Sequence, residues 1–282
     1  PRTQADDDKL GVALQRLQAE DPALHVERAE ETKQTLLRGV GETHLQVTIE
    51  RLARRGVNID SEELRVPYRE TVSGTAEAEG KVKKQSGGHG QYAVCFLRVS
   101  PRARGAGFEW VDSIVGGSIP RNFIPAVHKG VEETLSGGGV YGFPIVDVRV
   151  ECFDGKYHSV DSSEMAFKTA AAHGLKEAMT HAGVAVLEPI SMLEVTVPAA
   201  YQGDVMGDIN SRRGRMLGTD SAGNGEHTVI AHVPTSEIAR YAIDLRSMTG
   251  GRGRFTAHHD HYDVLPAHLV GKAKASLTSS HG

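Results

Sequence analysis

The stretch LEPISMLEVTV at residues 187–197 decides how the C-terminal part of this chain folds. Leu193, Val195 and Val197 alternate there with polar residues such as Glu194 and Thr196, and this period of two predicts a strand with one buried face. The patterns that follow give the order β-α-β-β-α-β of a ferredoxin-like unit. The predicted elements are a strand at 187–197, a helix at 201–213, strands at 215–219 and 226–233, a helix at 235–248 and a strand at 254–262.

Residues 1–66 repeat this order of elements without the first strand. The predicted elements are a helix at 6–20, strands at 24–28 and 35–40, a helix at 41–55 and a short closing strand at 57–61. We therefore predict a second ferredoxin-like unit whose first strand is truncated. The complete unit occupies residues 187–265, and we expect the Ser-, Lys- and Ala-rich tail at 266–282 to be disordered.

Residues 67–186 show a different pattern and predict a separate domain, which makes the chain an α+β protein of three domains. Two long strands at 71–85 and 91–100 flank a glycine-rich loop, and a helix at 120–135 begins at Pro120. An alternating strand at 145–152 precedes a turn at Asp154 and Gly155, a polar loop and a helix from 162 to about 181. The glycine-rich loop is the first polar loop of this domain, and the loop before the last helix is the second. Both lie at one end of the domain if the strands pair as expected.

The second polar loop runs into a helix start in YHSVDSSEMAF at 157–167. Asp161 can accept a backbone N–H of the first turn and Glu164 can reach back, which is a variant of the capping box. Ser162 and Ser163 would then be exposed first residues of the helix, whose free N–H groups can bind phosphate oxygens. We interpret Asp161 as a structural residue that orders the loop presenting His158.

Composition restricts the classes of function. The formal net charge of the 282 residues is −4, which argues against a nucleic-acid-binding protein that acts by bulk positive charge, so any RNA contact must be local. No apolar run approaches the roughly 18 residues of a membrane span and no signal-peptide pattern is seen, so we expect a cytoplasmic protein without a membrane partner. Cys95 and Cys152 are the only cysteines, and we expect them to be buried, reduced thiols.

Short motifs along nearly the whole chain, in unbroken order, resemble bacterial elongation factor G. They are EDP at 20–22, GE and HL within 41–45, QSGG at 85–88, GQY at 90–92, YH at 157–158, VDSSEMAF at 160–167, LEP at 187–189, SRRGR at 211–215, and LRS and TG within 245–250. The chain is similar to the three C-terminal domains of that translational GTPase, numbered III, IV and V.

The resemblance implies a ribosome-binding function in translocation during protein synthesis. Domain IV of the family has a ribosomal-protein-S5-like fold, and its two loops enter the decoding region of the small ribosomal subunit. Domain V lies near rRNA of the large subunit. We expect a monomer whose partner is the ribosome.

The chain has no G-x-x-x-x-G-K-[ST] loop, the motif that cradles nucleotide phosphates. We therefore expect no catalytic residue and no cofactor in this chain, with GTP and Mg²⁺ bound only by a nucleotide domain that it lacks. The chain is then a truncated form or a natural half-protein, and the missing first strand of the first unit favours truncation.

Departures from the family pattern favour a divergent paralogue. Thr43 stands where the family usually has Leu, residues 51–57 differ, and His89 replaces the Arg that usually follows the two glycines. Because histidine is largely neutral at pH 7, this change weakens a phosphate contact. The alternatives that stay open are a ribosome-recycling paralogue that splits subunits, a ribosome-protecting paralogue, and a GTPase-less module that binds ribosomes or RNA. An enzyme is the remaining class, and no nucleophile–base pair supports it.

The resemblance assigns ribosome or RNA contact to both polar loops and to nearby cations. The predicted contact residues are Lys83, Lys84, Gln85, Ser86, Gly87, Gly88, His89, Gly90, Gln91, His158, Ser159, Asp161, Ser162, Ser163, Arg212 and Arg213. The structural alternative for the first loop is a flexible glycine hairpin. For Arg212 and Arg213 it is a pair of cations that stabilise a helix C-terminus.

Three histidines near the end of the chain form the remaining cluster. On a strand, His259 and His261 share one face while His258 and Asp260 share the other, and the sequence nearby shows no further ligand group. We therefore expect no metal site there.

Overall fold

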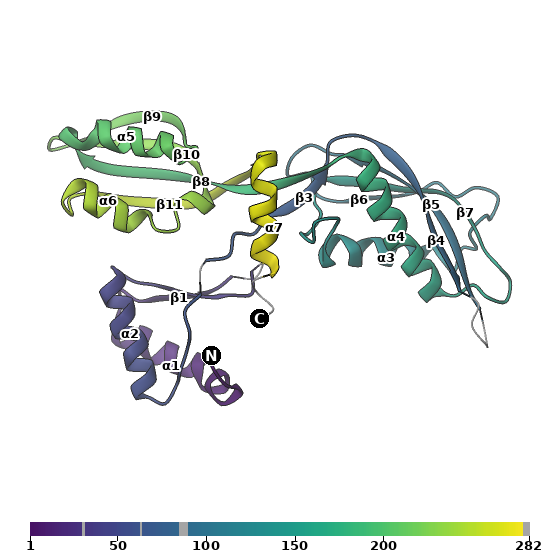
Figure 1. The fold of residues 1–282 in the computed structure, drawn as a ribbon, viewed down its shortest axis with the longest axis horizontal. Helices are drawn as coiled ribbons and strands as arrows, with labels where there is room; N and C mark the ends of the chain where they lie inside the picture. The colour runs from purple at the N-terminus through teal and green to yellow at the C-terminus, as the bar shows by residue number, and fades with distance from the viewer. Residues whose placement is uncertain (30–31, 63, 85–89, 279–282) are drawn as a thin grey trace. The chain divides into compact units, whose positions relative to one another are not determined.

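The structure is a computed structural model that describes residues 1–29, 32–62, 64–84 and 90–278. The chain divides into two compact units. The first unit contains Pro1–Pro67 and Pro189–His261, and the second contains Tyr68–Glu188 and Tyr262–Gly282. Helices and strands are mixed in both units, in agreement with the predicted α+β class (Figure 1).

The C-terminal part of the first unit has the predicted ferredoxin-like topology. Its elements are β8 (Val184–Pro198), a 3-10 turn (Ala199–Tyr201), α5 (Gln202–Ser211), β9 (Arg215–Gly223), β10 (Glu226–Pro234), a second 3-10 turn (Thr235–Glu237), α6 (Tyr241–Thr249) and β11 (Arg254–Val264). The order across the sheet is β11-β8-β10-β9, so the first and third strands of the unit are central. This order follows from the β-α-β-β-α-β connectivity.

The alternation in β8 and β10 separates the two faces of this sheet. Val195 lies opposite Val229 in the antiparallel register, and both are buried against apolar residues of α5 and α6. The next residues along each strand point to the other face. His232 of β10 lies opposite Met192 of β8 and is on this second face, which the helices do not cover.

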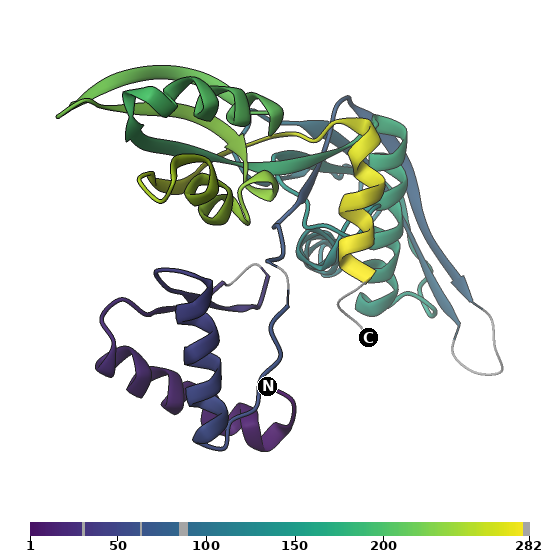
Figure 2. The ribbon, with the colours of Figure 1, turned by 60° about the vertical axis from the view of Figure 1, so that its left-hand side comes forward.

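The N-terminal part of the first unit is smaller. Its elements are α1 (Gln4–Glu20), β1 (His25–Arg28), β2 (Thr35–Arg38) and α2 (Glu42–Arg54). β1 and β2 pair as an antiparallel two-stranded sheet, and Figure 2 shows α1 and α2 beside it. Leu14 and Leu17 of α1 and Leu52 of α2 are buried between these elements and belong to the core of this part.

The closing strand predicted at 57–61 was wrong. Val57 is buried in the core of this part, but the backbone after it makes no strand ladder among the described residues. The N–H of Asn58 donates to the Asp6 carboxylate at 2.9 Å, and its carbonyl accepts the N–H of Arg2 at 3.0 Å. These groups are therefore satisfied by the start of α1 and not by a neighbouring strand.

The second unit contains a four-stranded sheet with two helices. Its elements are β3 (Arg69–Val72), β4 (Ala76–Lys84), β5 (Gln91–Pro101), β6 (Glu109–Asp112), α3 (Ile124–Gly137), β7 (Val148–Lys156) and α4 (Glu164–Ala182). The sheet order is β4-β5-β7-β6, with β6 parallel to β7, while β3 pairs with β8. α3 and α4 pack on one face of the sheet, and β4 and β5 run side by side as a long antiparallel pair (Figures 1 and 2).

Three predicted boundaries in this unit were wrong. The predicted strand at 71–85 is interrupted after Val72, because Ser73 and its neighbours turn away and the N–H of Ser73 donates to the Gly183 carbonyl. The helix predicted at 120–135 is α3, which begins at Ile124 and has Pro125 in its first turn, so Pro120 lies outside it. β7 continues to Lys156, and a register shift in its ladder with β5 absorbs the irregularity that was predicted as a turn.

Glycines allow α4 to approach β4 closely. A Cβ atom placed on Gly80 would lie 2.0 Å from the carbonyl oxygen of Ala170, which no packing permits. Gly174 of α4 lies against Gly80 from the other side of the contact. The sheet and the helix therefore touch through backbone atoms at this point.

A buried carboxylate holds the segment that joins α3 to β7. Glu70 is fully buried, and its oxygens accept the N–H groups of Val140 at 2.8 Å and of Tyr141 and Phe143 at 2.9 Å. Burial raises the pKa of the Glu70 carboxyl above its ordinary value, and these hydrogen bonds oppose that rise. Glu70 thus anchors the segment to β3.

The disordered tail predicted at 266–282 was wrong for the residues that the structure describes. A 3-10 turn (Ala267–Leu269) leads into α7 (Val270–Thr278). Ala273 is buried in a cluster with Phe143, Val186 and Leu265, and Leu269, Val270 and Leu277 pack against it. Positions 269, 273 and 277 recur every four residues, which is the spacing of one helix face. Small and charged residues between them hid this pattern in the sequence.

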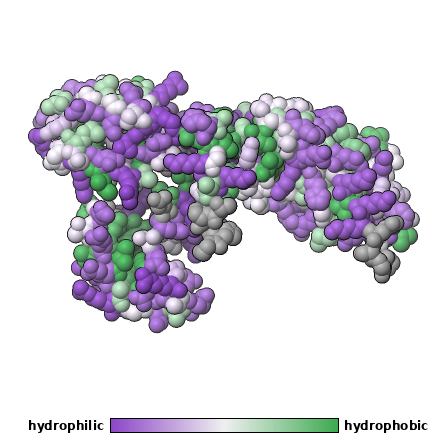
Figure 3. Space-filling view, viewed as in Figure 1, coloured by the Kyte–Doolittle hydropathy of each residue, from purple (hydrophilic) through white to green (hydrophobic). Residues whose placement is uncertain are grey.

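The surface drawn in Figure 3 is mainly hydrophilic over the strands of the second unit. Among the helices in the described part of the chain, none combines the length and apolar character that crossing a membrane needs.

Candidate functional site

Two chain segments meet at one end of the second unit. β4 ends at Lys84 and β5 begins at Gln91, and these two residues are paired in the ladder. The loop between β7 and α4 comes to the same place, because the N–H of Tyr92 donates to the carbonyl of Asp161 at 2.8 Å. The prediction that both polar loops lie at one end of the domain is confirmed for Gly90, Gln91 and the 157–163 loop. The remaining predicted residues of the first loop, Gln85, Ser86, Gly87, Gly88 and His89, lie outside the described residues.

Ser162 fastens the second loop to β5. Its hydroxyl donates to the Tyr92 carbonyl at 2.7 Å and accepts the N–H of His158 at 2.9 Å. The N–H of Ser162 in turn donates to the His158 carbonyl at 3.1 Å. One serine therefore closes the loop on itself and joins it to the neighbouring strand. Tyr92 was not among the predicted site residues, although the GQY motif at 90–92 contains it.

His158 has a defined orientation within this loop. Its Nδ1 atom accepts the N–H groups of Val160 at 3.3 Å and of Asp161 at 3.2 Å. Nδ1 is the acceptor in both hydrogen bonds, so the ring proton is assigned to Nε2. The side chain is 53% exposed and its ring lies edge-on to Tyr92, with centroids 6.3 Å apart. The loop therefore holds one side of a half-exposed imidazole ring and leaves Nε2 available for a partner.

The helix cap predicted at Asp161 was wrong. α4 begins at Glu164, its N-cap is Ser163, and the Ser163 hydroxyl accepts the N–H of Ala166 at 3.2 Å. Ser163 remains exposed at the helix start, and Ser159 is exposed in the loop. The carboxylate of Asp161 lies 3.4 Å from Nδ1 of His158, so this residue belongs to the loop and not to the cap.

Gly90 allows the first loop to lie against the second. A Cβ atom at this position would lie 2.9 Å from the carboxyl carbon of Asp161 and 3.0 Å from one of its oxygens. A side chain at residue 90 would therefore push the two segments apart. The close approach explains why a glycine occupies the last position before β5.

Exposed cations flank the two segments. Lys83 and Lys84 are exposed at the end of β4, and Lys156 is exposed at the end of β7. Tyr157 and Val160 are also exposed, at 49% and 65%. This end of the unit thus combines flexible ammonium groups, one oriented imidazole and the free start of a helix. Such groups can donate to phosphate oxygens, and the described arrangement contains no nucleophile–base pair.

Arg212 and Arg213 lie in the first unit and take part in a network within it. The guanidinium of Arg212 donates to the carboxylates of Asp208 and Asp244, each at 2.8 Å, and to the carbonyl of Glu237 at 2.8 Å. Its side chain is 17% exposed, and the carboxylate of Asp208 is the largest cause of its raised pKa. Arg213 pairs with Glu237 at 3.1 Å. These contacts give both residues a structural role, and the predicted RNA contact stays a prediction.

Comparison with known proteins places the chain. Family models match it in three consecutive parts: "Elongation Factor G, domain III" at residues 1–63, "Elongation factor G, domain IV" at 64–183 and "Elongation factor G C-terminus" at 185–273. The chain belongs to the elongation factor G family. The meeting point of the two segments described above is therefore the tip of domain IV.

Two curated relatives are named "Elongation factor G-like protein" and come from Mycobacterium tuberculosis strains CDC 1551 / Oshkosh and ATCC 25618 / H37Rv. Each is 49% identical over 271 residues, which is 96% of this chain and 38% of the relative. The chain thus spans well under half the length of these proteins. A crystal structure of a Thermus thermophilus protein superposes with a TM-score of 0.82 at 40% identity, covering 100% of this chain and 42% of that one.

Proposed function

We propose that this chain is the ribosome-binding portion of an elongation factor G-like translational GTPase, and that the whole protein acts in translocation in the cytoplasm. GTP and Mg²⁺ would be bound by a nucleotide domain outside this chain. The tip of domain IV would act by occupying space and by contacting phosphates, without covalent chemistry. We further propose that domain V contacts large-subunit rRNA and that the protein works as a monomer.

The observation that carries this proposal is the construction of the tip. Ser162 and Tyr92 fasten the His158 loop to the end of the β4–β5 pair, and backbone N–H groups of the loop hold Nδ1 of the half-exposed His158 ring. A loop that only connects β7 to α4 does not need these contacts. Donors held in fixed positions beside exposed lysines fit a rigid, phosphate-rich partner, because phosphate contacts fix register and orientation.

The test uses the full-length protein with ribosomes from the same organism. We would measure single-turnover translocation with GTP and, separately, subunit splitting in the presence of a recycling factor. Translocation supports the proposed function. Splitting alone would make the protein a recycling paralogue, which the departures at Thr43 and 51–57 also allow. If neither occurred, the proposed function would be wrong.

Two variants of His158 distinguish the role of its Nε2–H donor from the role of Nδ1 in ordering the loop. In His158→Asn the side-chain oxygen can accept the same two backbone N–H groups as Nδ1, but the amide N–H lies closer to the backbone than Nε2–H, so the long-reaching donor is lost. In His158→Ala both are lost. We expect both variants to slow translocation by about tenfold, equivalent to about 1.4 kcal/mol of transition-state stabilisation.

The matched control is His173→Ala. His173 is an exposed histidine on α4 of the same unit, away from the tip. We expect it to leave the rate unchanged. Equal rates for His158→Asn and the wild type would show that the Nε2–H donor makes no contact that matters for translocation.

A further inference from the structure

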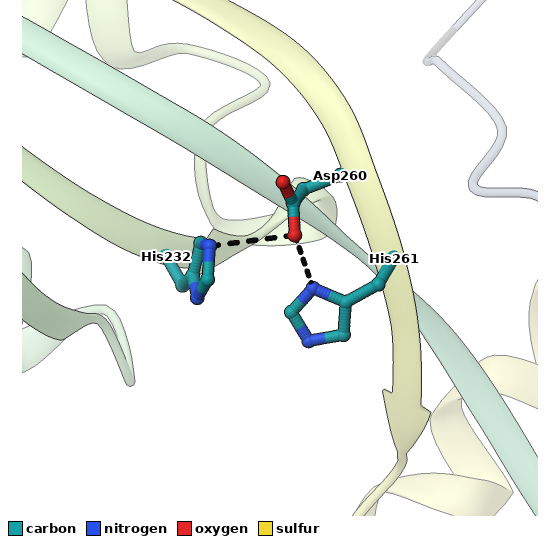
Figure 4. Close-up of side chains that lie close together, drawn as sticks. All are labelled: His232, Asp260 and His261. Atoms are coloured by element: carbon teal, nitrogen blue, oxygen red, sulfur yellow. Dashed lines mark hydrogen bonds and ion pairs between the residues drawn. The ribbon is translucent and has the colours of Figure 1, made fainter. Parts of the chain in front are cut away.

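His232, Asp260 and His261 come together beside the domain V sheet, although Asp260 and His261 were predicted to lie on opposite faces of their strand. His232 projects from β10, and Asp260 and His261 come from β11 (Figure 4). An oxygen of Asp260 lies 2.6 Å from Nδ1 of His261 and 3.4 Å from Nε2 of His232. One possible ligand atom from each residue lies within 4.8 Å of the other two. β8 runs between β10 and β11, so the cluster bridges the central strand.

One atom of this cluster lacks a hydrogen bond. Nε2 of His232 is buried, and in the described part of the chain no partner satisfies it. Its 3.4 Å separation from the Asp260 carboxylate is an ion-pair distance without hydrogen-bond geometry. Because buried polar atoms are nearly always paired, this nitrogen needs an explanation. A bound cation would be coordinated directly by the lone pair of this nitrogen.

The residue types and distances fit a zinc site. Zinc binds imidazole nitrogen and carboxylate oxygen at about 2.0–2.2 Å in tetrahedral geometry, which places neighbouring ligand atoms about 3.3 Å apart. The 3.4 Å between His232 and Asp260 already has this value. The 2.6 Å between Asp260 and His261 must open by about 0.7 Å. The His261 side chain is 40% exposed and has room to turn.

We propose that His232, Asp260 and His261 bind a divalent zinc ion, with water completing its coordination. Two imidazoles and one carboxylate are a common ligand set for zinc sites that keep an open position. The ion would join β10 to β11 across β8 and stabilise this part of domain V. This site is independent of the tip of domain IV and of the proposed function.

The first experiment measures zinc binding by the purified, metal-stripped chain in competition with a chromophoric chelator. We expect one zinc ion per chain. His232→Gln and His261→Gln should each weaken binding by more than about tenfold, because each removes a ligand. His25→Gln is the control, since it removes an exposed histidine of β1 outside the cluster.

Two outcomes would overturn the proposal. If the chain bound no zinc at micromolar concentration, the cluster would be a charge network only. If His232→Gln kept the affinity of the wild type, zinc would be held elsewhere among the other histidines.

A measurement on the wild type protects the test against variants that fail to fold. X-ray absorption of the zinc-loaded chain should show two imidazole nitrogens and oxygen ligands. A spectrum with sulfur ligands, or without imidazole, would also refute the assignment. Zinc should further raise the melting temperature of the wild type and of His25→Gln, but not that of His232→Gln.

Discussion

Removing the carboxylate of Glu70 should strongly destabilise the second unit. Glu70→Ala leaves the N–H groups of Val140, Tyr141 and Phe143 without the acceptor that lies 2.8–2.9 Å from them. A buried donor without a partner costs about 1–3 kcal/mol. Water can enter the vacated volume and relieve part of this, so we take the lower value for each of the three donors. The expected loss is about 3 kcal/mol in the free energy of unfolding of the second unit.

The same residue predicts a pH dependence. Burial raises the pKa of Glu70 in the folded state, so the folded chain keeps a proton that the unfolded chain has already lost. The contribution of this group to stability therefore falls as the pH rises above about 4.5 and becomes constant above the raised value. Glu70→Gln cannot titrate. The free energy of unfolding of the wild type minus that of Glu70→Gln should therefore decrease as the pH rises through this window, while titrations elsewhere cancel.

Trp110 makes this measurement specific. It is the only tryptophan of the chain and lies in β6 of the same unit as Glu70. Its fluorescence during urea unfolding, recorded at several pH values, reports on this unit alone. A loss below about 1 kcal/mol for Glu70→Ala would mean that the three N–H groups find other acceptors, and the reasoning would be refuted.

Three further predictions concern the second unit. Gly80→Ala should lower its free energy of unfolding by about 1–3 kcal/mol because the new carbon overlaps α4; Gly137→Ala, with no atom within 4 Å of the added carbon, should cause no loss in the same urea assay. Ser162→Ala should lower the free energy of local opening by about 1–2 kcal/mol, seen as faster amide exchange in the tip loop, and unchanged exchange would contradict the contacts described. Burial raises the pKa of Cys95 to about 12 and also raises that of Cys152, so neither thiol should react with Ellman's reagent at pH 8 until urea unfolds the unit.

The sequence predicted well those parts of the fold in which each element carries its own pattern. The alternation around Leu193 and Val195 predicted β8. The order of helices and strands after it then predicted the ferredoxin-like strand order that the sheet has. Prediction from the sequence failed where contacts between distant segments decide the local structure. Val57 looked like a strand residue because it is apolar, but the backbone beyond it pairs with α1. α7 has few large apolar residues, and its helix is held by a cluster that forms only when Phe143 comes near.

The candidate site shows the same limit. Asp161 and Ser163 are both good cap residues, and the sequence alone cannot choose between them. Ser163 is the N-cap because the carbonyl of Asp161 already accepts the N–H of Tyr92 and is not available to the first turn of the helix. The partner of the Asp260 and His261 pair was also missed. His232 comes near them only through the order of strands in the sheet, and no local pattern reports that order.

The fastening of the tip loop to β5 has a mechanical consequence. β4 and β5 are paired without a break from Ala76 and Val99 to Lys84 and Gln91, and nine residues of strand extend about 30 Å. Because the far end of this ladder also carries the His158 loop, a push at its base cannot be absorbed by bending at the loop. The segment works as a stiff rod with a fixed head. We therefore expect the His158 loop to move together with the base of this ladder.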